Sequence, residues 1–183
     1  MMKILAICGS LRANSSNLAV LQAAKLLAPQ MTEIILFDGL EALPYFNPDL
    51  DTETPPPPVL KLREAVGSAD GLLICSPEYA RGVAGVMKNA LDWLVSCFEF
   101  PDKPVAVINA SQRSTHADAA LRLTLETMSA RLIEEASITL ALLGRGLDAA
   151  GIAQDPELSS QLRMALHHME RFVIRSADEL RSE

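Results

Sequence analysis

The chain has 183 residues, of which 49 % are hydrophobic and 21 % are charged, a composition that excludes disordered and fibrous proteins. Its net charge of −7, without a cluster of Lys and Arg, argues against nucleic acid and anionic membrane surfaces as partners. The first residues read as a core strand rather than a leader peptide, and no apolar run is long enough to span a membrane. We therefore expect one cytoplasmic domain over residues 1–183.

Apolar runs typical of strands alternate along the chain with segments of helical periodicity. The expected strands cover residues 3–8, 32–37, 71–76, 104–110 and 136–142. The expected helices cover residues 16–28, 58–69, 82–96, 115–131 and 156–180. This alternation predicts an α/β fold, in which a five-stranded parallel sheet carries helices on both faces. The proline run at 55–58 is expected to be a stiff spacer, with a polyproline ligand as the alternative.

The loop at residues 9–17 joins the first strand to the first helix, where backbone N–H groups and the helix dipole favour an anion. Arg12 adds a fork of donors that matches phosphate oxygens. Further donors come from Ser10, Ser15, Ser16 and Asn17. The loop therefore predicts a phosphate site. The alternative is a helix N-cap beside an exposed arginine.

In an open parallel sheet the ligand lies beyond the carboxyl ends of the strands, so the loops at 76–83 and 110–115 face the same edge as the first loop. The segment Ser76-Pro77-Glu78-Tyr79 combines a rigid proline with a large ring, which suits a planar heterocycle. Together the loops predict a mononucleotide site. The alternative for this segment is a tight turn with a tyrosine on the surface.

The cysteines and histidines do not indicate a metal or redox centre. Cys8, Cys75 and Cys97 show no CxxC spacing, and we expect buried, reduced thiols. His116 stands alone, and two adjacent histidines at 167–168 would face different directions on a helix.

Three motifs give the chain a resemblance to the NADPH-dependent FMN reductase family, which includes quinone and chromate reductases. They are Gly9-Ser10-Leu11-Arg12 with Ser15 and Asn17, then Ser76-Pro77-Glu78-Tyr79, then Lys88-Asn89-Ala90-Leu91-Asp92-Trp93. The resemblance implies a flavodoxin-like fold with strand order 2-1-3-4-5. It also implies bound FMN, NADPH or NADH as reductant, a small acceptor such as a quinone or free flavin, and a homodimer or homotetramer.

By this resemblance, the FMN phosphate binds Ser10, Arg12, Ser15 and Asn17, with Ser16 beside them in the same loop. The flavin ring lies along Pro77, Glu78 and Tyr79, and the loop that contains Ser111 and Arg113 approaches its other side. FMN carries the chemistry, so we expect no catalytic residue and ping-pong turnover. Arg113 and Arg81 are candidates for the NADPH phosphate or are simply solvated.

The chain departs from many relatives in two loops. Ala80 stands where they carry Asn, and Ser114-Thr115-His116 stands where they carry glycines. These positions border the open face of the ring and leave the substrate undefined. An FMN-binding electron carrier or sensor without NAD(P)H turnover is the alternative function, and a scaffold domain that has lost its cofactor is a third.

Overall fold

The computed structural model describes the backbone of residues 1–182 and the side chains of residues 1–179. Its main sheet contains β1 (Met2–Cys8), β2 (Thr32–Leu36), β3 (Gly71–Cys75), β6 (Pro104–Val107) and β7 (Arg131–Leu132). All neighbours in this sheet pair in parallel, in the order β2-β1-β3-β6-β7. Counted along the main sheet alone, this is the predicted order 2-1-3-4-5, which is confirmed.

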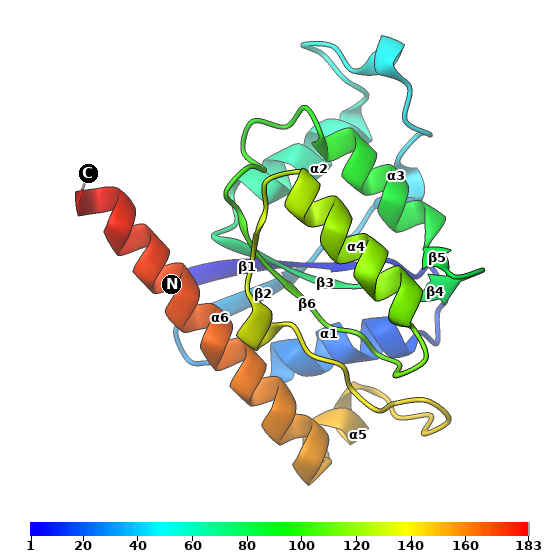
Figure 1. Cartoon of the computed structure of the whole chain (residues 1–183), viewed down its shortest axis with the longest axis vertical. Coiled ribbons are helices and arrows are strands. Elements are labelled where there is room, and N and C mark those ends of the chain that lie inside the picture. Colours follow the sequence, from blue (N-terminus) through cyan, green and yellow to red (C-terminus); the bar gives the residue numbers. More distant parts are fainter. Residues whose placement is uncertain (183) are drawn as a thin grey trace.

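Helices cover both faces of the sheet (Figure 1). One face carries α2 (Pro57–Gly67), α3 (Gly85–Leu94) and α4 (Thr115–Thr127). The other carries α1 (Ser16–Leu26), α5 (Ala149–Gln154) and α6 (Pro156–Ser182). Short 3-10 turns lie at Leu40–Ala42, Pro48–Leu50 and Glu134–Ala136. The five expected helices are present, and α5 is an additional one.

Alternation along each strand divides the core into two layers. In β1, Ile4 and Ala6 pack with α1 and α6, whereas Leu5 and Ile7 pack with α2 and α3. Successive side chains of a strand point to opposite faces, so a sheet covered on both sides needs an apolar residue at every position. This is why the strands read as continuous apolar runs.

The fifth strand differs from its prediction at 136–142. It starts earlier, at Arg131, and the 3-10 turn at Glu134–Ala136 interrupts it before an isolated parallel bridge joins Thr139 to Asn109. The Ser137 hydroxyl accepts the Val107 N–H at 3.0 Å, a bond that a regular neighbouring strand would make with a carbonyl. The apolar run therefore marks the sheet edge but not the start of the strand.

Four of the five expected helices are shorter than predicted, and the difference is largest for α3 and α4. The helix predicted over 115–131 ends at Thr127 because Ser129 has a φ of +64°. The N–H groups of Ser129 and Ala130 donate to the carbonyls of Glu126 and Leu125, both at 2.9 Å, in a Schellman motif. The helix predicted over 82–96 begins at Gly85, because a small hairpin of β4 (Glu78–Tyr79) and β5 (Gly82–Val83) precedes it.

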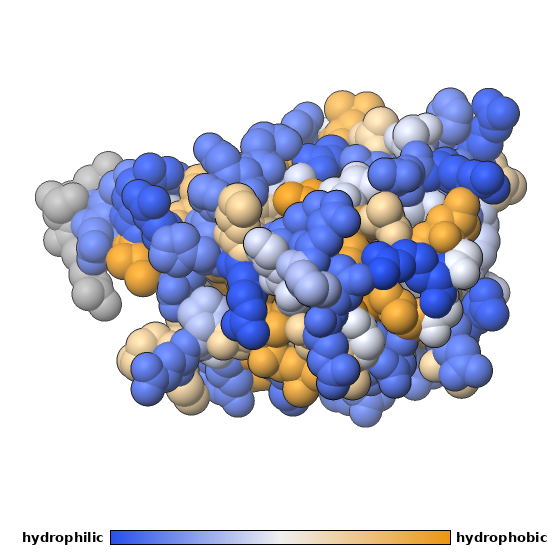
Figure 2. All heavy atoms as spheres, turned by 90° about the horizontal axis from the view of Figure 1, so that it is seen from below, coloured by the Kyte–Doolittle hydropathy of each residue, from blue (hydrophilic) through white to orange (hydrophobic). Residues whose placement is uncertain are grey.

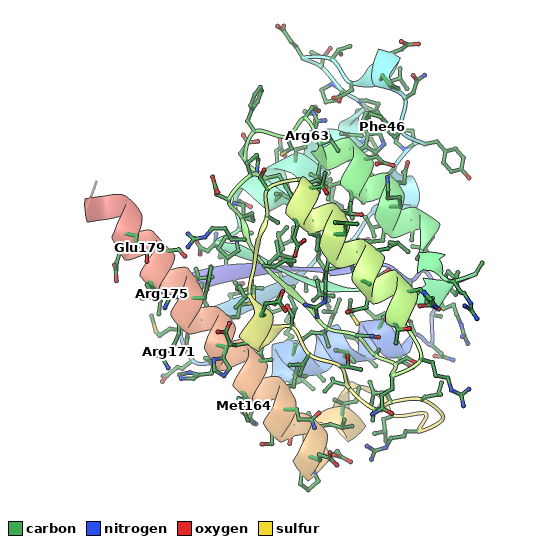
Figure 3. The ribbon with its side chains drawn as sticks, in the orientation of Figure 1. Phe46, Arg63, Met164, Arg171, Arg175 and Glu179 are labelled. Atoms are coloured by element: carbon green, nitrogen blue, oxygen red, sulfur yellow. The ribbon has the colours of Figure 1, made fainter. Side chains whose placement is uncertain are left out.

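The Lys88–Trp93 motif anchors the segment before the proline run. The side chains of Asn89 and Trp93 both donate to the Pro44 carbonyl, at 3.0 and 2.8 Å, and the Phe46 N–H donates to Asn89 at 2.8 Å. The rings of Phe46 and Trp93 pack edge to face, with centroids 5.0 Å apart. These contacts lie at the same end of the molecule as Arg63 (Figure 3). The proline run then opens α2, with Pro57 as its first residue.

The face seen in Figure 2 is mainly hydrophilic, with small apolar areas between charged side chains. Among the helices in the described part of the chain, none combines the length and the hydropathy of a membrane span.

Candidate functional site

The carboxyl ends of β1, β3 and β6 bring three loops together, at the edge where the β4–β5 hairpin and the start of α1 lie (Figure 1). A cavity of about 190 Å³ lies between these loops and residues 142–146. Its polar and rigid lining includes Ser16, Asn17, Ser76, Pro77, Ser111 and Ser114. The structure thus gathers side chains that are up to 127 positions apart in the sequence, from Ser16 to Leu143.

The start of α1 faces this cavity. Ser15 is the N-cap, and its hydroxyl accepts the Leu18 N–H at 3.4 Å. The buried Asn17 accepts a hydrogen bond from the Cys75 thiol through Oδ1, at 3.3 Å, which turns its amide NH2 group away from Cys75. The first N–H groups of a helix have no partner within the helix, so the cavity borders a set of anion donors.

Ser10 and Arg12 lie on the other side of the same loop. They line a separate hollow of about 470 Å³ that also contains Phe37 and Glu41, from the loop after β2. The Arg12 N–H donates to the Ser10 hydroxyl at 3.4 Å, and the Arg12 side chain is exposed. The structure therefore separates Ser10 and Arg12 from the 190 Å³ cavity, although they belong to the same loop as Ser16 and Asn17.

The second predicted loop contributes unevenly to the cavity. Pro77 lines it, whereas Tyr79 lies on the hairpin and is 53 % exposed. The Glu78 carboxylate accepts the N–H groups of His116 and Ala117 at the start of α4, each at 2.9 Å, and does not line the cavity.

A buried asparagine shapes the third loop. Asn109 accepts the Ser111 N–H at 3.0 Å and donates to the Ser114 carbonyl at 3.0 Å. Ser111 in turn accepts the Arg113 N–H at 3.2 Å, and the Arg113 side chain is exposed. The sequence analysis did not single out Asn109, although a polar residue at the end of an apolar strand is a signal for such a role.

Residues 142–146 form a wall of the cavity that the sequence analysis also missed. Gly144 and Gly146 have φ values of +77° and +59°, a region that favours glycine. The Gly-Arg-Gly sequence directly after an apolar run was the available signal for a turn here.

Gly9 and Ser76 make the closest approach between the loops. A Cβ at Gly9 would lie 2.3 Å from Ser76 Oγ and 3.0 Å from Ser76 Cα, so only glycine fits. Within the described part of the chain, Ser76 Oγ is buried without a hydrogen-bond partner, and Ser76 lines the cavity. A hydroxyl-rich or anionic ligand would satisfy such a group.

The electrostatic character of the cavity fits a ligand of this kind. Its lining contains serines and asparagines but no Asp or Glu. Burial raises the pKa of the Cys8 thiol and raises that of the Cys75 thiol further, so both stay protonated at neutral pH. A protonated, buried thiol is a poor nucleophile and a poor metal ligand, so the site offers hydrogen-bond donors rather than reactive groups.

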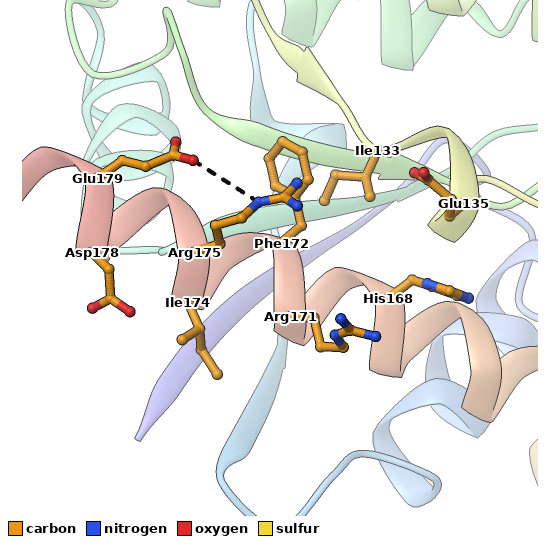
Figure 4. Close-up of a pocket in the computed structure, with 9 residues that line it drawn as sticks. All are labelled: Ile133, Glu135, His168, Arg171, Phe172, Ile174, Arg175, Asp178 and Glu179. Carbon is orange, nitrogen blue, oxygen red and sulfur yellow. Dashed lines mark ion pairs between the residues drawn. The ribbon is translucent and has the colours of Figure 1, made fainter.

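A larger cavity, of about 740 Å³, lies at α6 beside Ile133 and Glu135 (Figure 4). Two of its charged side chains, Arg175 and Glu179, form an ion pair, and Arg175 lies 5.5 Å from the centroid of the Phe172 ring. It contains none of the loops at the carboxyl ends of the strands. The smaller cavity is therefore the candidate site.

Comparison with known proteins gives the chain its relatives. A family model described as NADPH-dependent FMN reductase matches residues 2–142. An NAD(P)H-dependent FMN reductase of Pseudomonas aeruginosa is 34 % identical over 94 % of this chain and 96 % of its own length. A probable NADPH:quinone oxidoreductase of Oryza sativa is 28 % identical over 95 % of this chain and 90 % of its own length. The structure of FerB from Paracoccus denitrificans, a flavoenzyme NAD(P)H:(acceptor) oxidoreductase, has a TM-score of 0.79 at 24 % identity, covering 96 % of this chain and 98 % of FerB.

The contact between Gly9 and Ser76 leads to a stability prediction. Gly9→Ala should lower the free energy of unfolding by about 1–3 kcal/mol, because the added methyl group forces the ends of β1 and β3 apart. Gly85→Ala is the matched control, since no atom lies within 4 Å of a Cβ at that position. Chemical denaturation measures both. Adding Ser76→Gly to Gly9→Ala should restore part of the loss, and equal stability of the Gly9 and Gly85 variants would contradict the close approach.

Proposed function

This chain belongs to the NADPH-dependent FMN reductase family, and we propose that it passes a hydride from NAD(P)H through bound FMN to a small acceptor such as a quinone or free flavin. The observation that carries the proposal is the cavity at the carboxyl edge of the sheet. There the start of α1, Pro77 and Ser111 converge on a space lined by neutral hydrogen-bonding groups without a carboxylate.

The residues present fit FMN. A phosphate at the start of α1 would meet the helix dipole, Ser16 and the NH2 group of Asn17, and the unpaired hydroxyl of Ser76 suits the phosphate or the sugar-alcohol chain. The cavity, at about 190 Å³, is smaller than the roughly 300–1,000 Å³ of clefts that enclose a drug-sized ligand. The cavity would therefore hold only part of FMN, and Pro77 and the exposed Tyr79 would hold the flavin ring outside it, where a second substrate would have access.

When bound, FMN supplies the hydride-accepting ring, and the protein needs no acid, base or nucleophile of its own. The loop residues hold and orient the cofactor. Ser15 does so indirectly, because its hydroxyl caps α1 and fixes the donors of the first helical turn. We assign the phosphate to the loop named from the sequence: Ser16 and Asn17 act from the cavity, Ser15 through its cap of α1, and Ser10 and Arg12 from the hollow on the other side of the same loop.

This assignment gives a binding prediction. Arg12→Ala should weaken FMN binding by about 1–3 kcal/mol, because a charge-assisted hydrogen bond to the phosphate is lost. Fluorescence titration of the apoprotein measures the affinity. Riboflavin, which lacks the phosphate, should bind the variant and the wild type equally well. Arg163→Ala, an exposed arginine on α6, is the matched control and should bind FMN normally. An unchanged FMN affinity for Arg12→Ala would remove Arg12 from the site.

Arg113 and Arg81 are exposed on the loops that follow β6 and β3, and we assign them to the NADPH phosphate. Arg81 Nη1 lies 3.4 Å from His116 Nε2, so the side chains of Arg81 and His116 form one polar cluster.

Steady-state kinetics test the activity and this assignment. With a quinone as acceptor, initial velocities at varied NADPH should give the parallel double-reciprocal lines of ping-pong turnover. Arg113→Ala should raise the KM for NADPH and leave that for NADH unchanged, because only NADPH carries the extra phosphate. Intersecting lines would contradict the ping-pong scheme, and equal KM changes would contradict the role of Arg113. An FMN-loaded protein that does not oxidise NADPH would be an electron carrier or sensor.

We further propose that the chain acts as one domain, in the cytoplasm, as a homodimer or homotetramer. Its three cysteines, all within the described residues, are free thiols, as in a reducing compartment. Apolar side chains gather beyond the end of α3, where Val95 is 66 % and Phe98 is 96 % exposed. Such side chains suit a contact between copies. Light scattering after size-exclusion chromatography measures the assembly, and a monomer would contradict it.

A further inference from the structure

Glu78 links the two loops that border the candidate site, although its side chain does not line the cavity. Its carboxylate accepts the N–H groups of His116 and Ala117, each at 2.9 Å. These are donors of the first turn of α4, which a helix cannot satisfy internally. Ser114, the N-cap residue of α4, makes no side-chain capping bond. The cap of α4 thus comes from a residue 38 positions away from His116.

The hairpin that begins at Glu78 is not held in place by its own turn. Ala80 and Arg81 have φ values of +49° and +59°, which the two central residues of a type I′ turn require. Asn and Gly adopt this conformation readily, whereas other residues are strained by roughly 1 kcal/mol or more. The two strands have only two residues each, too few to be stable alone. Contacts outside the hairpin must therefore fix its position.

Those contacts come from the N-terminal turn of α4. Besides the Glu78 carboxylate, Arg81 Nη1 lies 3.4 Å from His116 Nε2. Glu78 directly follows Ser76 and Pro77, which line the cavity, and α4 directly follows Ser114, which lines it too. The hydrogen bonds between Glu78 and the start of α4 therefore fix the distance between the two loops that contribute these lining residues.

We propose that Glu78 is a positioning residue for the cofactor: its carboxylate clamps residues 76–79 to the start of α4, and so holds the FMN site in its binding geometry without touching FMN. The inference rests on the proposed function. This positioning role differs from direct contact with the flavin ring, because the Glu78 carboxylate points to α4. A negative group at a helix N-terminus is also favoured by the helix dipole.

The test compares Glu78→Ala, Glu78→Asp and Glu78→Gln. Ala removes the acceptor, and Asp retains the charge on a side chain one methylene shorter. Gln keeps an acceptor oxygen at full reach and loses the charge. FMN affinity is measured by fluorescence titration, and the clamp itself by amide hydrogen exchange of His116 and Ala117 in the apoprotein. The midpoint potential of bound FMN reports any direct contact of the carboxylate with the ring.

We expect Ala and Asp to weaken FMN binding by about tenfold or more, since two backbone donors lose their acceptor, and to speed exchange at both amides. Gln should bind FMN within about twofold of the wild type, with an unchanged midpoint potential, because its oxygen can accept the same bonds. If Ala does not fold, the Asp variant carries the same prediction. Asp70→Ala is the matched control: Asp70 accepts the Lys3 N–H at 2.7 Å near the start of β1, away from the site. It should leave FMN affinity unchanged.

Two results would overturn the inference. One is faster amide exchange in Ala and Asp with normal FMN affinity, which would make Glu78 only a helix cap. The other is a shifted midpoint potential in Gln, which would place the carboxylate against the flavin. A wild-type protein that retains no FMN would overturn the proposed function, and this inference with it. Normal FMN binding by the wild type together with either of the first two results would leave the proposed function standing.

Discussion

The candidate site depends on how closely β1 and β3 approach each other at their carboxyl ends. Cys8 pairs with Cys75 in the parallel register, and the Gly9 N–H then donates to the Cys75 carbonyl at 2.8 Å. Because Gly9 has no Cβ, the Ser76 side chain can lie directly beside it. The start of α1 and residues 76–77 consequently face one cavity. A side chain at position 9 would separate the two loops that we assign to the phosphate and the flavin ring.

The three motifs of the family resemblance have different physical roles. Asn17 of the first motif and Ser76 and Pro77 of the second line the cavity. The third motif is structural: Asn89 and Trp93 donate to the Pro44 carbonyl, and Lys88 pairs with Asp92 on the surface of α3. Next to them, hydrogen bonds from Ser96 and Arg63 lower the pKa of Asp51. The contribution of Asp51 to the free energy of unfolding is complete above the pKa of Asp in the unfolded chain. It is lost as the pH falls through the lowered pKa of Asp51 in the folded protein.

The sequence predicted well those parts of the fold in which burial dictates the pattern. β1, β3 and α1 are long apolar elements between clear turn signals, so their positions followed directly. The β4–β5 hairpin could not be found, because its turn residues, Ala80 and Arg81, are not typical of a type I′ turn and tertiary contacts impose their conformation. The edge strand was misplaced because its apolar residues continue through a 3-10 turn and an irregular segment that contribute to the core without regular pairing.

The same distinction applies to the site. Residue types identified Ser16, Asn17, Pro77 and Ser111, which do line the cavity. They could not reveal that Glu78 turns toward α4 or that Ser10 and Arg12 face a separate hollow, because these outcomes depend on hydrogen bonds between distant loops. Asn109 was missed for a similar reason, since its role lies in the backbone groups that it organises.

An anaerobic visible spectrum of the purified protein, reconstituted with FMN, desalted and then titrated with NADPH, tests the central claim most directly. We predict that the flavin absorbance is retained through desalting and bleaches within seconds of adding NADPH. Retained absorbance that does not bleach would contradict the assignment as a reductase, and absorbance lost on desalting would contradict the assignment of the cavity to FMN.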